Sequence, residues 1–314
     1  MSVEHVLWVE KYRPKKIADC VLSEVVKREA QGFVTKGEMP NLLLAGPAGT
    51  GKTTLAKALC NEMNYEWMMI NGSDEGRLID TLRNKIKNFA TTVSFSDKRK
   101  IVIIDEADYI PVDTQAALRS FIEEYSANCG FIFTCNFPNR LMDAIHSRCT
   151  TISFVIPTDE QAAVQKEIYK RAAKVLKAEN IEFDQKVLAV LVKKFYPDFR
   201  RLLNELQRFS SGGKIDETVL SQIKSNISEL LKVLADKDFR GMRTWVAKAP
   251  SLDMAPLARA LYDQMYDYLE PGPSMADLVL VLADYQYKHA FVADKEINIV
   301  AMLTQIMMTC QFRK

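Results

Sequence analysis

The sequence predicts a parallel α/β domain with helices on both faces of its sheet, followed by two smaller helical domains. Short apolar runs rich in β-branched residues alternate with helical stretches over the first half of the chain, a pattern typical of buried parallel strands. After Pro157 only helical periodicity is found, and a second helical region begins near Asn226. We therefore expect an α/β core at residues 1–156, a helical lid at 157–225 and a helical C-terminal domain at 226–314.

The composition is that of a soluble globular protein. Of the 314 residues, 48% are hydrophobic and 26% are charged, which excludes a disordered chain. The formal net charge is only +2, so any nucleic-acid site must be a local patch. No C-x-x-C pair occurs among the six cysteines, which disfavours a zinc module. No apolar run approaches the roughly 20 residues that span a bilayer. We expect a cytoplasmic protein with no membrane partner.

Four apolar runs mark the expected strands of the core. They lie at residues 41–45, 101–104, 131–135 and, more weakly, 151–155. Each is short and bounded by polar or turn-forming residues, so each fits a strand better than a helix. The carboxyl ends of parallel strands meet at one edge of the sheet, where ligands of open α/β folds bind.

The lid is expected to consist of three helices. Thr158 and Gln161 have the spacing of a capping box, with Thr158 as the N-cap. Asp184 can cap a second helix. Pro197–Asp198 opens a third helix, which should end at Gly212–Gly213.

A phosphate-binding loop follows the first expected strand. Residues 46–53 match G-x-x-x-x-G-K-[ST] and precede a predicted helix, the context that distinguishes this motif from a chance glycine turn. Backbone N–H groups and the helix N-terminus would face phosphate oxygens, and Lys52 would add a cation. The expected phosphate-binding residues are Gly46, Pro47, Ala48, Gly49, Thr50, Gly51, Lys52, Thr53 and Thr54.

Two acids end the second expected strand. Asp105 and Glu106 follow the run at 101–104. With Thr53, Asp105 is placed to hold Mg²⁺, and Glu106 is placed to orient or deprotonate an attacking water. An ordinary strand end with solvated acids is the alternative, and the upstream phosphate loop favours the functional interpretation.

Together the motifs resemble those of AAA+ clamp loaders, namely the replication factor C small subunits and the large subunit of T-even-type phage clamp loaders. The residues around 128–129 and 197–200 resemble the phage sequences more than the archaeal ones. The motifs that carry the resemblance are E-K-Y-R-P at 10–14, the phosphate loop, D-E-A-D at 105–108, T-C-N at 134–136, S-R-C at 147–149 and P-D-F-R at 197–200.

The resemblance implies further residues of an ATP site. Tyr12, Arg13 and Pro14 would line the adenine pocket. Asn136 would contact the γ-phosphate or the water, and Arg200 would reach the phosphates from the lid. From the residues alone, Asn136 could simply form a turn before proline, and Arg200 could be a solvated side chain.

Arg148 of the S-R-C motif is the most informative single residue. The resemblance implies an arginine finger that acts on the ATP of a neighbouring subunit, so that the active site is complete only between subunits. A surface salt bridge after a helix is the alternative that the residues alone leave open.

A helix over residues 78–90 is expected to face DNA. Its apolar residues recur at helical spacing, with basic residues on the opposite side. The resemblance implies contacts to the DNA backbone, which position a protein without specifying sequence; a merely solvated face is the alternative. Gln115 and Arg119 resemble a family helix near the subunit interface. The expected DNA-binding residues are Arg77, Arg83, Asn84 and Lys87.

The resemblance implies an ATP- and Mg²⁺-dependent subunit of a DNA sliding-clamp loader. Its partners would be a sliding clamp, primer–template DNA and other loader subunits, with a homotetramer and a distinct small subunit as the expected assembly. If the gene is phage-borne, the host cytoplasm is the expected location. Two alternatives are another AAA+ motor, such as a branch-migration helicase, and a non-hydrolysing scaffold subunit. Intact Lys52, Thr53, Asp105 and Glu106 disfavour the scaffold.

Overall fold

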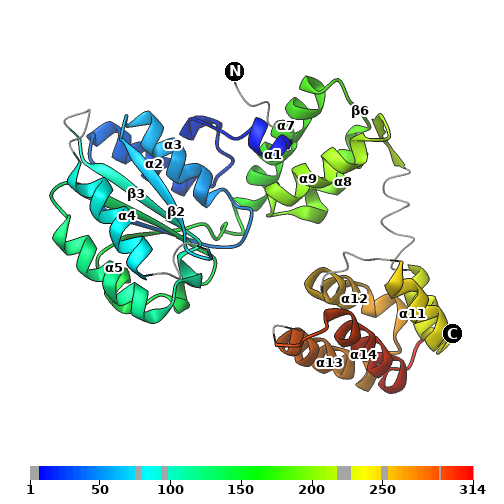
Figure 1. Ribbon diagram of the computed structural model, residues 1–314. Helices are drawn as coiled ribbons and strands as arrows, with labels where there is room; N and C mark the ends of the chain where they lie inside the picture. The colour runs from blue at the N-terminus through cyan, green and yellow to red at the C-terminus, as the bar shows by residue number, and fades with distance from the viewer. Residues whose placement is uncertain are drawn as a thin grey trace. The chain divides into compact units, whose positions relative to one another are not determined.

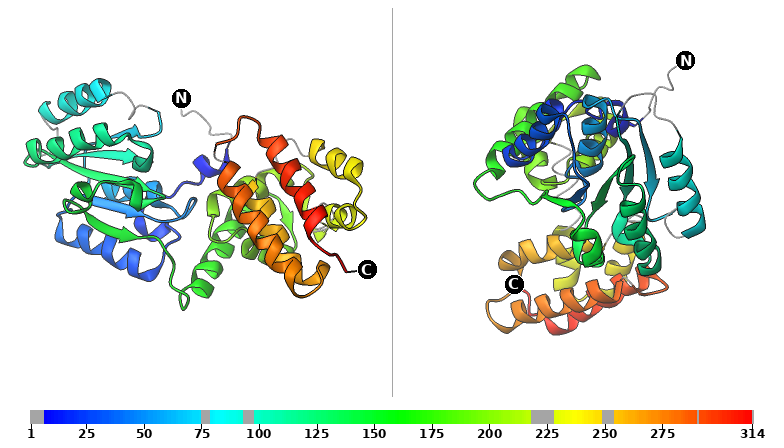
Figure 2. Two further views of the ribbon diagram at one scale, coloured as in Figure 1. Left: turned by 90° about the horizontal axis from the view of Figure 1, so that it is seen from below. Right: turned by 90° about the vertical axis from the view of Figure 1, so that its left-hand side faces the viewer.

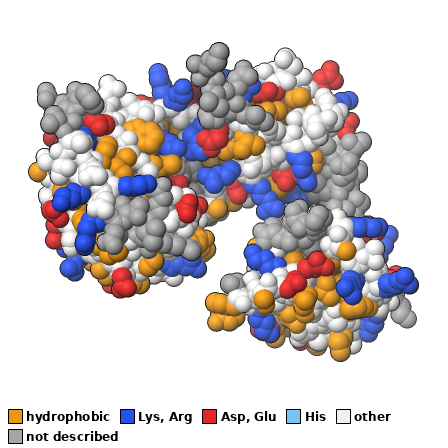
Figure 3. All heavy atoms as spheres, viewed as in Figure 1, with side chains coloured by type: hydrophobic (Ala, Val, Ile, Leu, Met, Phe, Trp, Pro, Cys, Tyr) orange, Lys and Arg blue, Asp and Glu red, His pale blue; other side chains and the backbone are white. Residues whose placement is uncertain are grey.

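The chain folds into two compact units, residues 1–216 and 217–314, coloured blue to green and yellow to red in Figure 1. The computed structural model describes residues 7–74, 79–92, 98–217, 228–248, 254–289 and 291–313. No helix within these ranges has the length and apolar character that crossing a bilayer requires. Acidic and basic side chains are mixed over the visible face of each unit (Figure 3).

A five-stranded parallel sheet forms the core of the first unit. Its order is β2-β3-β4-β1-β5, so β1 lies between β4 and β5. The predicted α/β core is confirmed, and each of the four predicted apolar runs overlaps a strand. The strands are β1 Leu42–Ala45, β2 Trp67–Asn71, β3 Lys100–Asp105, β4 Cys129–Cys135 and β5 Thr150–Ser153.

The sheet has a hydrophobic core on each face, because alternate residues of a strand point to opposite sides. Leu42 and Leu44 of β1 pack with α2 and α3, whereas Leu43 packs on the side of α4, α5 and α6. The left view of Figure 2 shows these two helical layers with the sheet between them. The helices are α1 Trp8–Lys11, η1 Ile17–Asp19, α2 Glu24–Lys36, α3 Lys52–Glu62, α4 Ile79–Thr91, η3 Ala107–Tyr109, α5 Val112–Glu124, η4 Pro138–Arg140 and α6 Asp143–His146.

Sequence reasoning missed the edge strand β2. Its sequence, Trp-Met-Met-Ile-Asn, has one β-branched residue, and only Ile70 is buried. An edge strand pairs on one side only, here with β3, so it needs less of the apolar pattern by which buried strands are recognised.

The lid contains three helices, but two details of its prediction are wrong. Thr158 is not the N-cap, because α7 begins at Gln161 after Glu160. Glu160 instead accepts a hydrogen bond from the backbone N–H of Glu24. The lid is also not purely helical, because two short parallel strands pair within it. Asp184 caps its helix as predicted. The lid elements are α7 Gln161–Ala178, β6 Glu182–Phe183, α8 Gln185–Phe195, α9 Phe199–Ser210 and β7 Lys214–Ile215.

The second unit is helical in its described parts and has its own core. Leu230, Leu231 and Leu234, which have helical spacing in the sequence, are buried in it. They pack with apolar residues of the four long helices that follow. These helices are α11 Phe239–Ala247, α12 Met254–Tyr268, α13 Pro273–His289 and α14 Lys295–Thr309.

Candidate active site

A cavity lies at the carboxyl edge of the sheet, where the strands end, and it continues to the lid. The phosphate loop follows β1, Asp105 ends β3 and Asn136 follows β4. Because these strands are parallel neighbours, the three segments meet at one edge. The cavity is lined by most of the residues predicted for the nucleotide site: Tyr12, Arg13, Pro14, Ala48, Gly49, Thr50, Gly51, Lys52, Thr53, Thr54, Asp105, Glu106, Asn136 and Arg200.

Gly46 and Pro47, also predicted for this site, do not line the cavity but accept hydrogen bonds from Lys52. Its Nζ donates to the carbonyl oxygens of Gly46 at 2.8 Å and Pro47 at 2.7 Å. It also donates to Asn136 Oδ1 at 2.8 Å. All three acceptors are neutral. The Lys52 side chain is buried, and this burial lowers its pKa. A desolvated cation held only by neutral acceptors suits an anionic ligand.

The lid reaches the phosphate loop at Gly49. This residue has a positive φ of 72°, and a Cβ atom added to it would lie 1.7 Å from Asp198 Oδ1. Asp198 caps α9 by accepting a hydrogen bond from the N–H of Arg201. Only glycine leaves room for this contact. It brings the first turn of α9, with Arg200, to the cavity.

Asp105 and Glu106 are held by one hydroxyl that sequence reasoning missed. Thr134 Oγ1 donates to Asp105 Oδ1 at 2.6 Å and accepts from the N–H of Glu106 at 3.1 Å. Thr53 Oγ1 donates to the same Asp105 oxygen, also at 2.6 Å. Glu106 has a positive φ of 55°, a conformation that non-glycine residues keep only where their surroundings fix it. Pairing of Ile104 with Phe133 places Thr134 beside Asp105.

Asp108 is a second positioning residue that sequence reasoning did not single out. It is buried, and its Oδ2 accepts from the N–H groups of Asn136 at 3.2 Å and Phe137 at 3.1 Å. The turn after β4 is thereby fixed. Asn136 lies at the bend that follows β4, and its side chain accepts a hydrogen bond from Lys52.

The N-terminal segment, which lines the cavity at Tyr12 and Arg13, is hydrogen-bonded to the lid. Tyr12 donates its hydroxyl to Glu179 Oε1 at 2.5 Å, and Arg171 Nη2 donates to the carbonyl oxygen of Tyr12 at 3.1 Å. Arg13 forms an ion pair with Glu10. Lys11 and Tyr12 both lower the pKa of Glu179 by hydrogen bonding to its carboxylate.

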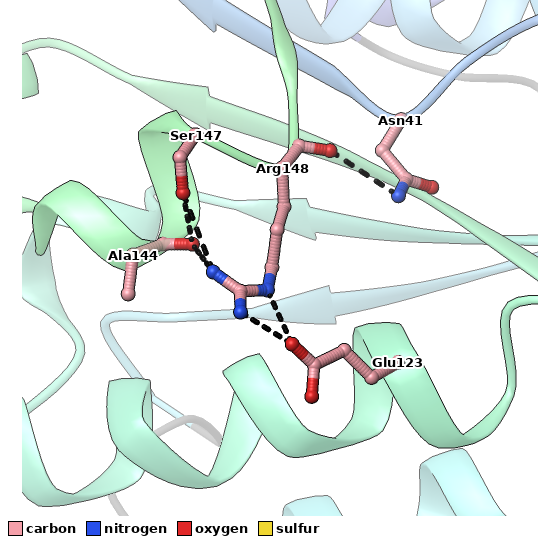
Figure 4. A network of polar contacts seen from close by, with 5 residues as sticks. All are labelled: Asn41, Glu123, Ala144, Ser147 and Arg148. Atoms are coloured by element: carbon pink, nitrogen blue, oxygen red, sulfur yellow. Dashed lines mark hydrogen bonds and ion pairs between the residues drawn. The ribbon is translucent and has the colours of Figure 1, made fainter.

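Arg148 lies at the opposite edge of the sheet. It immediately precedes Cys149 and β5, and its carbonyl oxygen accepts a hydrogen bond from Asn41, which precedes β1. Both β1 and β5 have four residues, so about 13 Å of sheet separates this amino edge from the cavity. The Arg148 guanidinium pairs with Glu123 of α5 (Figure 4). The surface salt bridge considered for Arg148 therefore forms within the chain.

Helix α4 presents the expected basic face. Arg83, Asn84 and Lys87 are exposed, whereas Leu82 and Ile86 are buried. Arg77, also predicted to bind DNA, lies outside the described residues.

The segment that leads toward α4 touches the backbone of Glu106. Gly72 donates its N–H to the Asp105 carbonyl oxygen at 2.7 Å. A Cβ atom on Gly72 would lie 2.5 Å from the Glu106 carbonyl oxygen. The chain that follows β2 and the end of β3 are therefore in direct backbone contact.

Gln115 joins three segments of the core through hydrogen bonds. Its Nε2 donates to the carbonyl oxygens of Ile110 at 2.9 Å and Arg140 at 3.1 Å. Its Oε1 accepts from the N–H of Met142 at 2.9 Å. The chain after Asp105–Glu106, the chain after Asn136 and the approach to α6 are thus joined through one buried amide.

Two family models match successive parts of the chain. The model described as "ATPase family associated with various cellular activities (AAA)" matches residues 42–156. The model described as "Sliding-clamp-loader large subunit, AAA+ ATPase lid domain" matches residues 160–221. The sliding-clamp-loader large subunit of Escherichia phage RB69 is 37% identical over 317 residues, which cover 99% of this chain and 97% of that protein. This chain belongs to the AAA+ sliding-clamp-loader family.

Other clamp-loader proteins agree with this membership. The sliding-clamp-loader large subunit of Enterobacteria phage T4 is 35% identical over 99% of this chain and 98% of its own length. The replication factor C small subunit of Saccharolobus solfataricus is 41% identical over 68% of this chain and 64% of its own length.

A solved structure of another protein has a similar fold. The Holliday junction branch migration motor of Thermotoga maritima has a TM-score of 0.57 at 18% identity and covers 91% of this clamp-loader chain and 90% of its own. At this identity the likeness concerns the fold alone.

Proposed function

We propose that this chain is an ATP-hydrolysing subunit of a DNA sliding-clamp loader whose active sites form between neighbouring subunits. One observation carries the proposal. The cavity gathers a phosphate loop, two acids and a polar strand end at the carboxyl edge of the sheet, whereas Arg148 is held at the amino edge. The arginine cannot reach the nucleotide of its own chain across the sheet, which supports a role on the nucleotide of another subunit.

ATP would bind between the core and the lid. Lys52 and Arg200 would contact the phosphates, since both line the cavity and each adds a cation. Tyr12, Arg13 and Pro14 would enclose the adenine end. Mg²⁺ is a hard cation that prefers oxygen ligands, so the oxygens of Thr53 and Asp105, which already meet, would hold it and let it neutralise charge on the phosphates.

Hydrolysis would depend on Glu106 and Asn136. The Glu106 carboxylate would orient the attacking water or take its proton. Asn136 can donate to a phosphate oxygen and accept from water. Its Oδ1 now accepts from Lys52, and a phosphate oxygen that engaged Lys52 would leave the amide to contact the water.

The neighbour's Arg148 would complete the site. A cation that meets the transferring phosphoryl group lowers the barrier to its transfer, so ATP would both join two subunits and be hydrolysed at their junction. The helical second unit would form the oligomerisation collar. We propose a homotetramer that is joined by a distinct small subunit.

DNA would act through α4. Arg83, Asn84 and Lys87 would contact backbone phosphates of primer–template DNA, which suits loading at any sequence. The hydrogen bond from the Gly72 N–H to the Asp105 carbonyl oxygen would link this event to the strand end that carries Glu106. ATP would stabilise an assembly that holds an open clamp, and hydrolysis on DNA would release the closed clamp.

The alternative is a branch-migration motor of the same fold. The Thermotoga maritima motor shares the fold at 18% identity, which does not favour its function, whereas the phage clamp-loader relatives align with nearly the whole chain.

The deciding experiment measures ATP turnover by the full-length chain with its partner subunits, with and without a cognate clamp and primed DNA. We expect stimulation by both. Lys52→Ala should lower turnover about 10²- to 10³-fold, because it removes a preorganised cation. Movement of four-way junctions without any effect of the clamp would favour the alternative.

A further inference from the structure

The guanidinium of Arg148 donates four hydrogen bonds inside its own chain. Nε donates to Glu123 Oε1 at 2.9 Å, and Nη2 donates to the same oxygen. Nη1 donates to the carbonyl oxygen of Ala144 at 2.8 Å and to Ser147 Oγ at 3.3 Å. Figure 4 shows the side chain lying between α6 and α5 with all three nitrogens facing these acceptors. Bidentate recognition of a phosphate needs two N–H groups that point outward together, so some of these bonds must break first.

The bonds to Glu123 are the ones that can be exchanged. The Glu123 side chain is 59% exposed and comes from α5, whereas Ala144 and Ser147 are local to Arg148. An exposed ion pair of this kind is weak, because water and salt screen it. Release of Arg148 from Glu123 therefore costs little, and the carboxylate can be solvated at once.

The backbone of Arg148 is fixed, so the exchange needs only a side-chain rotation. Its N–H donates to the Ile145 carbonyl oxygen at 3.1 Å. Its carbonyl oxygen accepts from Asn41, whose own Oδ1 accepts from the N–H of Phe131. The amino ends of β1 and β4 thus hold the residue in place while its guanidinium remains exchangeable.

Glu123 cannot remain beside Arg148 once a triphosphate is bound there. Its charge would lie within a few ångströms of the phosphate oxygens and oppose them, and it would cancel the charge that makes Arg148 useful. On the basis of the proposed trans role of Arg148, we propose that Glu123 competes with the triphosphate of a neighbouring subunit for the Arg148 side chain. It holds the arginine finger in the unassembled chain and yields it only to the triphosphate of a neighbouring subunit.

The competition sets how tightly subunits join, because ATP-dependent association must displace Glu123. Glu123→Gln keeps the side-chain shape but removes the charge. It should lower the subunit concentration that gives half-maximal ATP turnover on primed DNA by about fivefold, the upper range for loss of an exposed ion pair. Glu124→Gln is the matched control, because Glu124 is also exposed and is not among the described partners of Arg148.

The experiment titrates the full-length chain, with its partner subunits, in the presence of ATP and primed DNA, and reads midpoint and plateau separately. A lower midpoint for Glu123→Gln alone supports the competitor. A lower plateau, or a higher midpoint, would instead make Glu123 an orienting residue of the assembled site and overturn the proposal. So would an equal shift in Glu124→Gln, which would indicate a general effect of charge.

The same titration separates this inference from the proposed function. Adding Glu123→Gln to Arg148→Ala should have no effect on association measured with a non-hydrolysable ATP analogue, because the two residues act through one contact. If Arg148→Ala abolishes turnover while Glu123→Gln changes nothing, the competitor is wrong and the trans finger remains. If Arg148→Ala itself is without effect, the trans finger fails and the competitor fails with it.

Discussion

The two edges of the central sheet are built for different tasks. At the carboxyl edge, the polar groups are buried or half-buried and bonded to one another: Lys52 to Asn136, Thr53 and Thr134 to Asp105. At the amino edge, the Arg148 side chain is 31% exposed and its partner Glu123 is 59% exposed. A rigid, desolvated site suits chemistry, whereas a solvated, exchangeable ion pair suits reversible contact with another subunit.

On the proposed function, this difference would explain how one chain could hold ATP without completing its hydrolysis. Each subunit would carry the larger part of one active site and the last residue of another. The catalytic cation is then supplied only by assembly, so turnover is coupled to the state of the whole loader.

The largest effect is expected from a substitution that removes the arginine at the amino edge and leaves the carboxyl edge intact. Arg148→Ala should bind ATP with unchanged affinity, because Arg148 is not among the described residues that line the cavity of its own chain. DNA-stimulated turnover should fall about 10³-fold or more, as for other arginine fingers. Nucleotide binding and steady-state turnover, measured on the same preparation, check this. Equal losses of binding and turnover would place Arg148 in the cis site after all.

An intermediate effect is expected at the carboxyl edge. Thr134→Val removes the hydroxyl that joins Asp105 to the Glu106 backbone while keeping the side-chain shape. An unsatisfied buried group costs about 1–3 kcal/mol, so turnover should fall roughly tenfold with little change in ATP affinity. Thr134→Ser retains the hydroxyl and should recover most of the rate. If valine and serine behave alike, the hydroxyl does not position the acids.

The smallest effect is expected on DNA binding. Arg83→Ala and Lys87→Ala should each weaken binding of primed DNA uniformly across sequences and reduce the slope of log affinity against log salt by about 1. Lys177→Ala is the control, because Lys177 is an exposed lysine of α7 in the lid. An unchanged salt slope in both α4 variants would remove this helix from the DNA surface.

Contiguous motifs made the carboxyl edge predictable from sequence. The phosphate loop, Asp105–Glu106 and Asn136 each follow an apolar run, and parallel pairing is enough to bring strand ends together. Thr134 and Asp108 lie within two of these motifs but were given no role of their own, because their contacts depend on strand register and on the fold of a turn, which no local pattern records.

The amino edge was harder to predict, because its contacts join residues that are distant in sequence. Arg148 could be identified by its motif, but Glu123 lies 25 positions away. Salt bridge and arginine finger were weighed as alternatives. The exchange proposed here allows both, one in the free chain and one in the assembly.

The most direct test of shared active sites mixes two inactive variants. Lys52→Ala chains would have a defective cavity but an intact Arg148, and Arg148→Ala chains would have the reverse. Mixed in equal amounts, they should recover DNA-stimulated ATP turnover, because roughly a quarter of randomly formed head-to-tail interfaces would pair an intact cavity with an intact arginine. A mixture no more active than either variant alone would contradict active sites built from two chains.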